Sequence, residues 1–148
     1  MLCKICVIIV TFNRKNYLLK LIDSLLSQTQ HIDTIILIDN NSTDGTESML
    51  KHKGFINQTK YDQRIVTNVK KLKFIYYRSS KNTGGSGGFQ KGFELAMNEE
   101  CDYIWAMDDD VRPKTDCLEQ LLKGMTNNIS VCIPNRNFNG YIDKAILG

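Results

Sequence analysis

The sequence predicts an α/β fold in which a mostly parallel sheet is flanked by helices. Two observations indicate this fold: short β-branched apolar runs alternate with segments of helical apolar spacing, and polar or glycine-rich turns follow the apolar runs. The chain has 148 residues, of which 42% are hydrophobic and 24% charged, as is usual for one folded domain. We therefore expect a single domain over residues 1–148.

The first four predicted elements alternate between strand and helix. Residues 5–11 (ICVIIVT) are apolar almost throughout, as in a parallel strand that is covered on both faces. Leucines and isoleucines then recur at helical spacing and predict a helix from about Asn16. A second buried strand is expected at 34–39 (TIILID), and a turn-rich string leads from it to a helix from about Thr46. This order is typical of right-handed βαβ units.

The second half continues the alternation. Strands are predicted at 72–77 (LKFIYY), 102–107 (DYIWAM) and 129–133. The helix between the first two has an expected apolar face made of Phe89, Phe93, Ala96 and Met97. A further helix is expected after Pro113, with the apolar residues Leu118, Leu121, Leu122 and Met125.

Residues 51–71 are predicted to form a basic surface insertion, because this segment contains several lysines and one arginine but only one acid, Asp62. Such an excess of charge usually keeps a surface solvated. The alternative is a platform for an anionic acceptor or for lipid headgroups, which would mean peripheral association with the inner face of the membrane.

Composition excludes several classes of function. The net charge of +3 is too balanced for a nucleic-acid-binding protein. The longest apolar run, residues 5–10, is much shorter than the about 20 residues of a membrane span, and no signal peptide is evident. The scattered cysteines favour the cytoplasm, and the pair Cys3 and Cys6 lacks the second pair that a zinc site needs. The oligomeric state stays open.

Three polar strings directly follow predicted strands: 11–14 (TFNR), 39–41 (DNN) and 108–110 (DDD). Because the carboxyl ends of parallel strands meet at one edge of a sheet, we expect the three strings to converge there. Three adjacent carboxylates repel one another unless a cation compensates them, and hard oxygen ligands favour Mg²⁺ or Mn²⁺. The alternative is a solvated acidic turn.

Glycines are concentrated at 84–88 (GGSGG), just before the third predicted helix. They match neither the dinucleotide-binding fingerprint nor a P-loop. Glycine backbone can approach a ligand closely, and the N-terminus of a helix favours an anion. The alternative is a flexible linker.

The strings VIIVTFNR, ILIDNNSTDGT and WAMDDD together resemble the nucleotide-sugar-binding part of the family 2 glycosyltransferases, which have the GT-A fold. The resemblance covers nearly the whole chain. The pattern N-x-G-G-x-G-G-F-x-x-G followed by W-x-x-D-D-D is most similar to galactofuranosyltransferases and related rhamnosyltransferases of bacterial polysaccharide assembly. The resemblance implies inverting transfer of a sugar from a nucleoside diphosphate to a glycan or lipid-linked acceptor.

The resemblance also implies roles for matching residues. Arg14 would reach the diphosphate, and Asp39 would accept a hydrogen bond from the base, most simply the N3–H of uracil or thymine. Asp109 would be available to hydroxyl groups of the sugar or ribose. The other implied donor-binding residues are Thr11, Asn13, Asn41, Asn82, Gly84, Gly85 and Gly88. The implied ligands of Mn²⁺ or Mg²⁺ are Asp108 and Asp110.

The resemblance does not identify a general base in this sequence. In the family it lies well downstream of the acidic triad, and none of the later acids here, Asp116, Glu119 and Asp143, is assigned the role. We expect the base and the acceptor half to lie beyond Gly148, so that these residues alone are inactive. The alternatives are a dTDP-rhamnose-type rhamnosyltransferase and a non-catalytic binding module. A nucleotidyltransferase is less consistent, because 11–14 contains no glycine.

Overall fold

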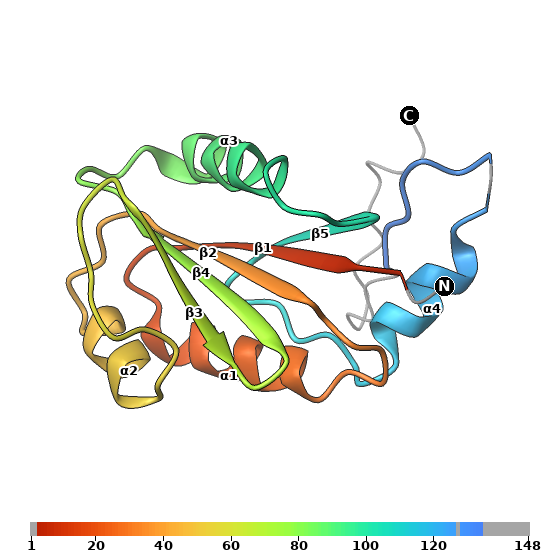
Figure 1. The fold of residues 1–148 in the computed structure, drawn as a ribbon, viewed down its shortest axis with the longest axis horizontal. Helices are drawn as coiled ribbons and strands as arrows, with labels where there is room; N and C mark the ends of the chain where they lie inside the picture. Colours follow the sequence, from red (N-terminus) through yellow and green to blue (C-terminus); the bar gives the residue numbers. More distant parts are fainter. Residues whose placement is uncertain (1–2, 127, 135–148) are drawn as a thin grey trace, which may run out of the picture.

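The structure, a computed structural model, describes residues 3–126 and 128–134 (Figure 1). Its sheet has five strands in the order β3-β4-β2-β1-β5. The parallel strands are β1 (Ile5–Thr11), β2 (Thr34–Asp39), β4 (Leu72–Arg78) and β5 (Tyr103–Asp108). The antiparallel strand is β3 (Arg64–Val69), which pairs with β4 at one edge. The predicted mostly parallel sheet is confirmed.

Helices cover both faces of the sheet. They are α1 (Lys15–Leu26), α2 (Thr46–His52), α3 (Gly84–Ala96) and α4 (Cys117–Gly124). Figure 1 shows α3 above the sheet and α1 and α2 below it. None of the helices in the described part of the chain is long and apolar enough to cross a membrane.

The two faces of β1 belong to two separate hydrophobic cores. Side chains alternate along a strand, so Ile5, Val7 and Ile9 pack with the buried leucines of α1, whereas Ile8 and Val10 pack with Ala96 of α3. Every residue of β1 is therefore buried, which is why its sequence shows an apolar run instead of an alternating pattern.

The apolar face predicted for α3 is partly wrong: Ala96 is buried and Phe89 packs against the same core, but Phe93 and Met97 do not. Phe93 and Met97 are 43% and 80% exposed, and the buried residues of α3 are Gly88, Gly92 and Ala96. These small residues recur every four positions and bring the helix backbone close to the sheet. A Cβ atom at position 88 would lie 2.5 Å from Cγ1 of Val10. Close approach thus decides which side of α3 faces the sheet.

Two other segments differ from the prediction. Residues 129–133 form no strand; β5 is therefore the edge strand of the described sheet. Within the predicted basic insertion, β3 is an additional strand whose Ile65 is buried, and Arg64 pairs with the carboxylate of Glu99, as does Lys73 of β4. This part of the insertion is an integral sheet edge with some of its charge neutralised.

Candidate functional site

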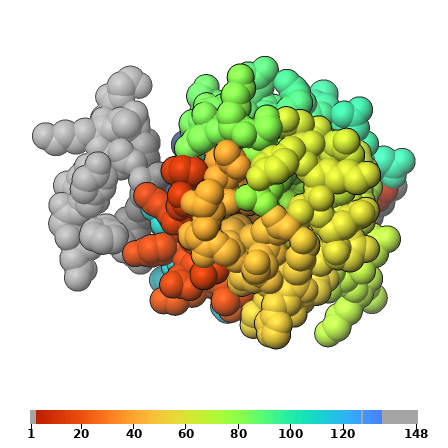
Figure 2. All heavy atoms as spheres, turned by 90° about the vertical axis from the view of Figure 1, so that its left-hand side faces the viewer, coloured from red at the N-terminus to blue at the C-terminus, as the bar shows by residue number. Residues whose placement is uncertain are grey.

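A cavity of about 440 Å³ lies at the carboxyl ends of β1 and β5. The strand order reverses between these strands, and such a reversal point is where open α/β sheets bind ligands. Figure 2 faces this edge, where residues after β1 and β2 meet the start of α3. The cavity is lined by Val10, Thr11, Phe12, Arg14, Asn40, Asn82, Gly84, Gly85, Asp108, Asp109 and Asp110. The three predicted polar strings therefore do converge.

Asp109 is the buried member of the acidic triad. Its carboxylate accepts a 2.7 Å hydrogen bond from the hydroxyl of Thr11, and the side chain is only 5% exposed. Burial raises the pKa of Asp109 above its usual 3.8, although the Thr11 hydroxyl and the positive charge of Arg14 act in the opposite direction. Asp109 thus joins β5 to β1 under the cavity.

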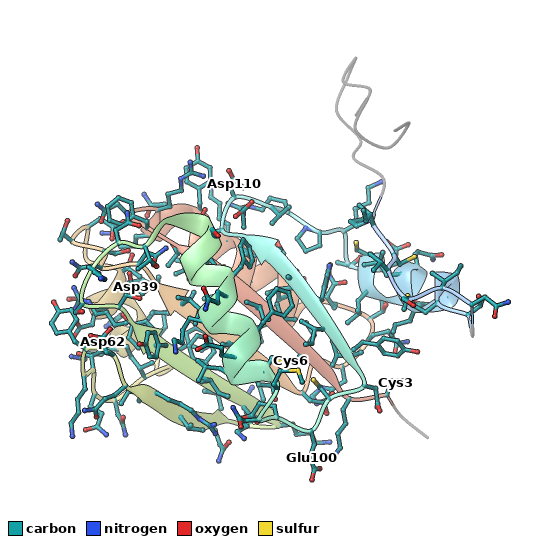
Figure 3. All side chains as sticks on the ribbon, turned by 90° about the horizontal axis from the view of Figure 1, so that it is seen from above. Cys3, Cys6, Asp39, Asp62, Glu100 and Asp110 are labelled. Carbon is teal, nitrogen blue, oxygen red and sulfur yellow. The ribbon has the colours of Figure 1, made fainter. Side chains whose placement is uncertain are left out.

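Arg14 and Asp110 form an ion pair on the cavity wall. Nη1 of Arg14 lies 2.7 Å from Oδ2 of Asp110 and 3.5 Å from Oδ1 of Asp109. The side chains of Arg14 and Asp110 are each 51% exposed. Figure 3 shows Asp110 beyond the end of β5, at the opposite end of the sheet from Cys3 and Glu100. Asp108 is exposed and has no ionic partner among the described residues.

The donor set of this cavity suits a hard divalent cation that also binds a phosphate. Residues 3–126 and 128–134 contain no group of three or more His, Cys, Asp and Glu side chains placed to hold a metal alone. Mg²⁺ and Mn²⁺, however, commonly take one or two protein carboxylates together with substrate phosphates. The exposed carboxylates of Asp108 and Asp110 on one cavity wall meet that requirement.

The loop after β2 brings Asn40, not Asp39, to the cavity. Asp39 is completely buried; its carboxylate accepts hydrogen bonds from the Tyr76 hydroxyl at 2.7 Å and the Ser42 amide at 2.7 Å. Asn40 lines the cavity and donates to the carbonyl of Gly84. Asn41, expected to bind the donor, instead donates to the carbonyl of Ser80.

Asn13 lies outside the main cavity and shapes the loop before α1. Its φ is +53°, its amide donates to the Ser42 hydroxyl, and its side chain accepts from the amide of Thr43. Asn13 lines a second cavity of about 300 Å³ that also includes Arg14 and Lys15. Arg14 is common to both cavities.

The glycine-rich string forms the first turns of α3. Gly84 and Gly85 line the cavity together with Asn82, whose side chain accepts from the amide of Gly84. Gly84 has a φ of +71°, a conformation that favours glycine. Gly88 lies deeper, against Val10, and does not line the cavity.

Sequence reasoning missed three residues of the cavity wall: Val10, Phe12 and Asn40. Phe12 and Asn40 belong to the polar strings at the strand ends, so their position directly after a strand could have identified them as cavity residues. The side chain of Phe12 is 44% exposed. An aromatic ring that is exposed on a cavity wall offers a surface for stacking.

Two acids after the triad, Asp116 and Glu119, do not line the cavity. Asp116 is the N-cap residue of α4, and Glu119 pairs with Lys123 and accepts from Thr29. Asp143 lies outside the described residues. Neither Asp116 nor Glu119 is therefore placed to act as a base at this site.

A comparison with protein families matches residues 6–145 to the model described as glycosyl transferase family 2. Galactofuranosyltransferase GlfT1 of Mycolicibacterium smegmatis is 30% identical over 119 residues, which are 80% of this chain and 34% of that protein. Abequosyltransferase RfbV of Salmonella typhimurium is 35% identical over 111 residues, 74% of this chain and 28% of that protein. The chain thus spans about a third of the length of these relatives.

Solved structures share the fold. A mannosyltransferase from Pyrobaculum calidifontis in complex with GDP-Man and Mn²⁺ superposes with a TM-score of 0.65 at 17% identity, covering 83% of this chain and 32% of that one. Staphylococcus aureus TarS 1–349 in complex with UDP gives a TM-score of 0.61 at 19% identity, with 81% and 31% covered. The expected GT-A fold is confirmed.

Proposed function

The chain belongs to glycosyl transferase family 2, and on this basis we propose that it forms the donor-binding part of an inverting glycosyltransferase. The donor is a UDP-sugar such as UDP-galactofuranose, and the acceptor is a glycan or a lipid-linked sugar of cell-surface polysaccharide synthesis. The observation that best supports this proposal is the acidic cavity at the reversal point of the strand order, where the start of α3 faces Arg14 and the triad. A galactofuranosyltransferase among the relatives supports the choice of sugar.

The charge of the cavity wall supports a metal-dependent donor site. Three carboxylates and one guanidinium line it, so the wall is formally negative. A nucleoside diphosphate would be repelled there without a cation of its own. Asp108 and Asp110 would hold Mn²⁺ or Mg²⁺, which would neutralise charge on the departing diphosphate. A neighbour of the same fold in complex with GDP-Man and Mn²⁺ supports this assignment.

The remaining wall residues bind and orient the donor. The guanidinium of Arg14 has donors left for the diphosphate, because only its Nη1 is engaged by the triad. The exposed ring of Phe12 stacks on the base. Thr11 holds Asp109 in place, and Asn40 and Asn82 supply amide groups beside the start of α3.

Transfer with inversion needs a carboxylate that takes the proton from the attacking acceptor hydroxyl. Because neither Asp116 nor Glu119 lines the cavity, we assign the base and the acceptor site to a part of the enzyme other than the donor cavity. We place the reaction in the cytoplasm, at the face of the membrane where lipid-linked acceptors are available.

Calorimetric titration of UDP, dTDP and GDP with and without Mn²⁺ tests the donor site. We expect UDP to bind only with Mn²⁺, and binding to weaken at least ~10-fold in Asp108→Asn, because one of two carboxylate ligands is lost. Asp116→Asn is the matched control, since it makes the same chemical change outside the cavity.

The choice of nucleotide decides between the donors. Preference for dTDP would replace the galactofuranose proposal with the rhamnosyltransferase alternative. If UDP-galactofuranose bound but were never hydrolysed or transferred, the non-catalytic binding module would be favoured. A folded sample that bound none of the nucleotides with Mn²⁺ present would refute the donor site.

A further inference from the structure

The acidic triad has a counter-ion of its own in Arg14. Nη1 of Arg14 contacts carboxylate oxygens of both Asp109 and Asp110. Among the described residues, these are the only ionic contacts of Arg14 and of the two aspartates. The guanidinium therefore lies against Oδ2 of Asp110, one of the carboxylate oxygens that a divalent cation in this cavity would use.

The backbone on both sides of Arg14 is fixed, whereas its side chain is free to move. The amide of Asn13 donates to the Ser42 hydroxyl at 2.9 Å, and the amide of Lys15 donates to Asp44 at 2.8 Å. The side chain of Arg14 is half exposed, and in the described part of the chain its guanidinium makes no hydrogen bond or ion pair besides those to the two carboxylates. A change of partner thus needs only rotation about side-chain bonds, not movement of the loop.

The ion pair of Arg14 with Asp110 is weak enough to exchange. Both side chains are 51% exposed, and an ion pair in solvent usually contributes little to stability because water screens it. The positive charges of a divalent cation and a guanidinium on the same carboxylate repel each other, so the binding of one weakens the binding of the other. Occupation of Asp110 by one cation therefore opposes occupation by the other.

On the basis of the proposed function, we propose that Arg14 is an exchangeable counter-ion of the acidic triad. It compensates part of the negative charge of Asp109 and Asp110 while the cavity holds no donor. It releases Asp110 when the divalent cation enters with the diphosphate, and then donates to the diphosphate oxygens. The exchange lowers the affinity for the metal alone and couples metal binding to donor binding.

Binding of Mn²⁺ alone, followed by electron paramagnetic resonance of the free ion, tests the exchange without any turnover. We expect Arg14→Gln to bind Mn²⁺ ~3- to 5-fold tighter than the unsubstituted chain, because a competing cation is removed. Arg14→Lys keeps the positive charge, so it should bind Mn²⁺ no more than ~2-fold tighter than the unsubstituted chain. This margin allows for the different geometry with which lysine and arginine pair with a carboxylate. UDP at saturating Mn²⁺ should bind ~10-fold more weakly to Arg14→Gln, through loss of a charged donor to phosphate.

Arg112→Gln is the matched control. It removes the same charge two positions after the triad, but Arg112 donates to the backbone carbonyls of Asp109 and Val111 and holds no carboxylate among the described residues. Equal gains in Mn²⁺ affinity for Arg112→Gln and Arg14→Gln would overturn the proposed exchange, because they would show that the loss of any nearby positive charge has the same effect. Unchanged or weaker Mn²⁺ binding by Arg14→Gln, or no Mn²⁺ binding by any variant, would also overturn it. Failure of UDP to bind to any variant would instead refute the proposed function.

Discussion

The hydroxyl of Thr11 donates a 2.7 Å hydrogen bond to Asp109, which lies 98 positions later in the sequence. Both side chains are buried. The bond joins the end of β1 to the end of β5. It gives one oxygen of the buried carboxylate a hydrogen-bond donor, which offsets part of the cost of its burial. The position of the acidic triad thus depends on a residue that is part of another strand.

Replacement of Thr11 by valine should destabilise the chain. Valine keeps the shape of threonine but removes the donor, so we expect the free energy of unfolding to fall by ~1–3 kcal/mol, as for other lost bonds to buried charged groups. Urea denaturation at pH 7 measures the loss. Thr11→Ser keeps the hydroxyl and should lose less, and an equal loss in both variants would show that the methyl group matters as much as the bond.

Replacement of Tyr76 by phenylalanine tests the buried contact with Asp39. The phenol donates to Asp39 at 2.7 Å, and both residues are fully buried. We expect a loss of ~1–3 kcal/mol in the free energy of unfolding, because a buried carboxylate loses a donor. In the neighbouring Tyr77→Phe, the bond lost is exposed and 3.4 Å long, so the change should stay within ~0.5 kcal/mol. Similar losses in both variants would contradict the prediction.

The close approach of α3 to the sheet predicts opposite effects for two glycines of the same helix. A Cβ at position 92 would overlap a methyl group of Ile8, whereas one at position 85 has open space within 4 Å. We expect Gly92→Ala to lower the free energy of unfolding by ~1–3 kcal/mol through overpacking. Gly85→Ala should raise it by up to ~1 kcal/mol, since alanine favours the helix. Thermal denaturation followed by circular dichroism measures both, and a neutral Gly92→Ala would refute the packing argument.

The strands β1, β2, β4 and β5 and the edge where the cavity lies could be predicted because they follow from local patterns. Uninterrupted apolar runs predict strands covered on both faces, and parallel strands end at the same edge. In contrast, β3 (RIVTNV) has a single buried residue, Ile65, although most of its residues are β-branched, and the lysines around it led to the prediction of a surface insertion. Its pairing with β4 comes from hydrogen bonds that composition does not show.

The choice between Asp39 and Asn40 could not be made from the sequence either. It depends on Tyr76, a partner 37 positions away on the neighbouring strand β4 that holds the carboxylate inside. Similarly, the buried face of α3 is defined by Gly88, Gly92 and Ala96. A hydrophobicity pattern selects the larger Phe93 and Met97 instead, because it does not register how closely two backbones approach.

The cysteines Cys3 and Cys6 should differ in reactivity. Cys3 is exposed, whereas Cys6 is buried in β1, and burial together with the neighbouring Cys101 and Glu99 raises the pKa of Cys6 to about 12. Because the thiolate is the reactive form, a maleimide at pH 7 should label Cys3 and leave Cys6 unmodified in the folded chain. Peptide mapping by mass spectrometry measures this, and labelling in guanidinium chloride is the control. Equal labelling in the folded chain would contradict the structure.

The carboxylate of Asp44 accepts hydrogen bonds at the start of two helices. It accepts from the amide of Lys15 at 2.8 Å, and from the amide and hydroxyl of Thr46 at 3.1 and 2.6 Å. Partial burial acts to raise the pKa of Asp44, but these hydrogen bonds outweigh it and lower the pKa below the usual 3.8. Asp44→Ala should therefore lower the free energy of unfolding at pH 7 by ~0.5–2 kcal/mol, as for other lost helix caps.

The sign of the pH dependence follows from the lowered pKa. A carboxylate that binds its proton less readily in the folded state contributes its full stabilisation above pH 3.8 and loses it as the pH falls through its folded pKa. The difference between the unsubstituted chain and Asp44→Ala should thus be constant from pH 7 to about pH 5 and shrink below pH 3.8. Asp23→Ala, at an exposed position of α1, should change the free energy by no more than ~0.5 kcal/mol. A difference for Asp44→Ala that grew on acidification would show that its carboxylate does not act through these hydrogen bonds.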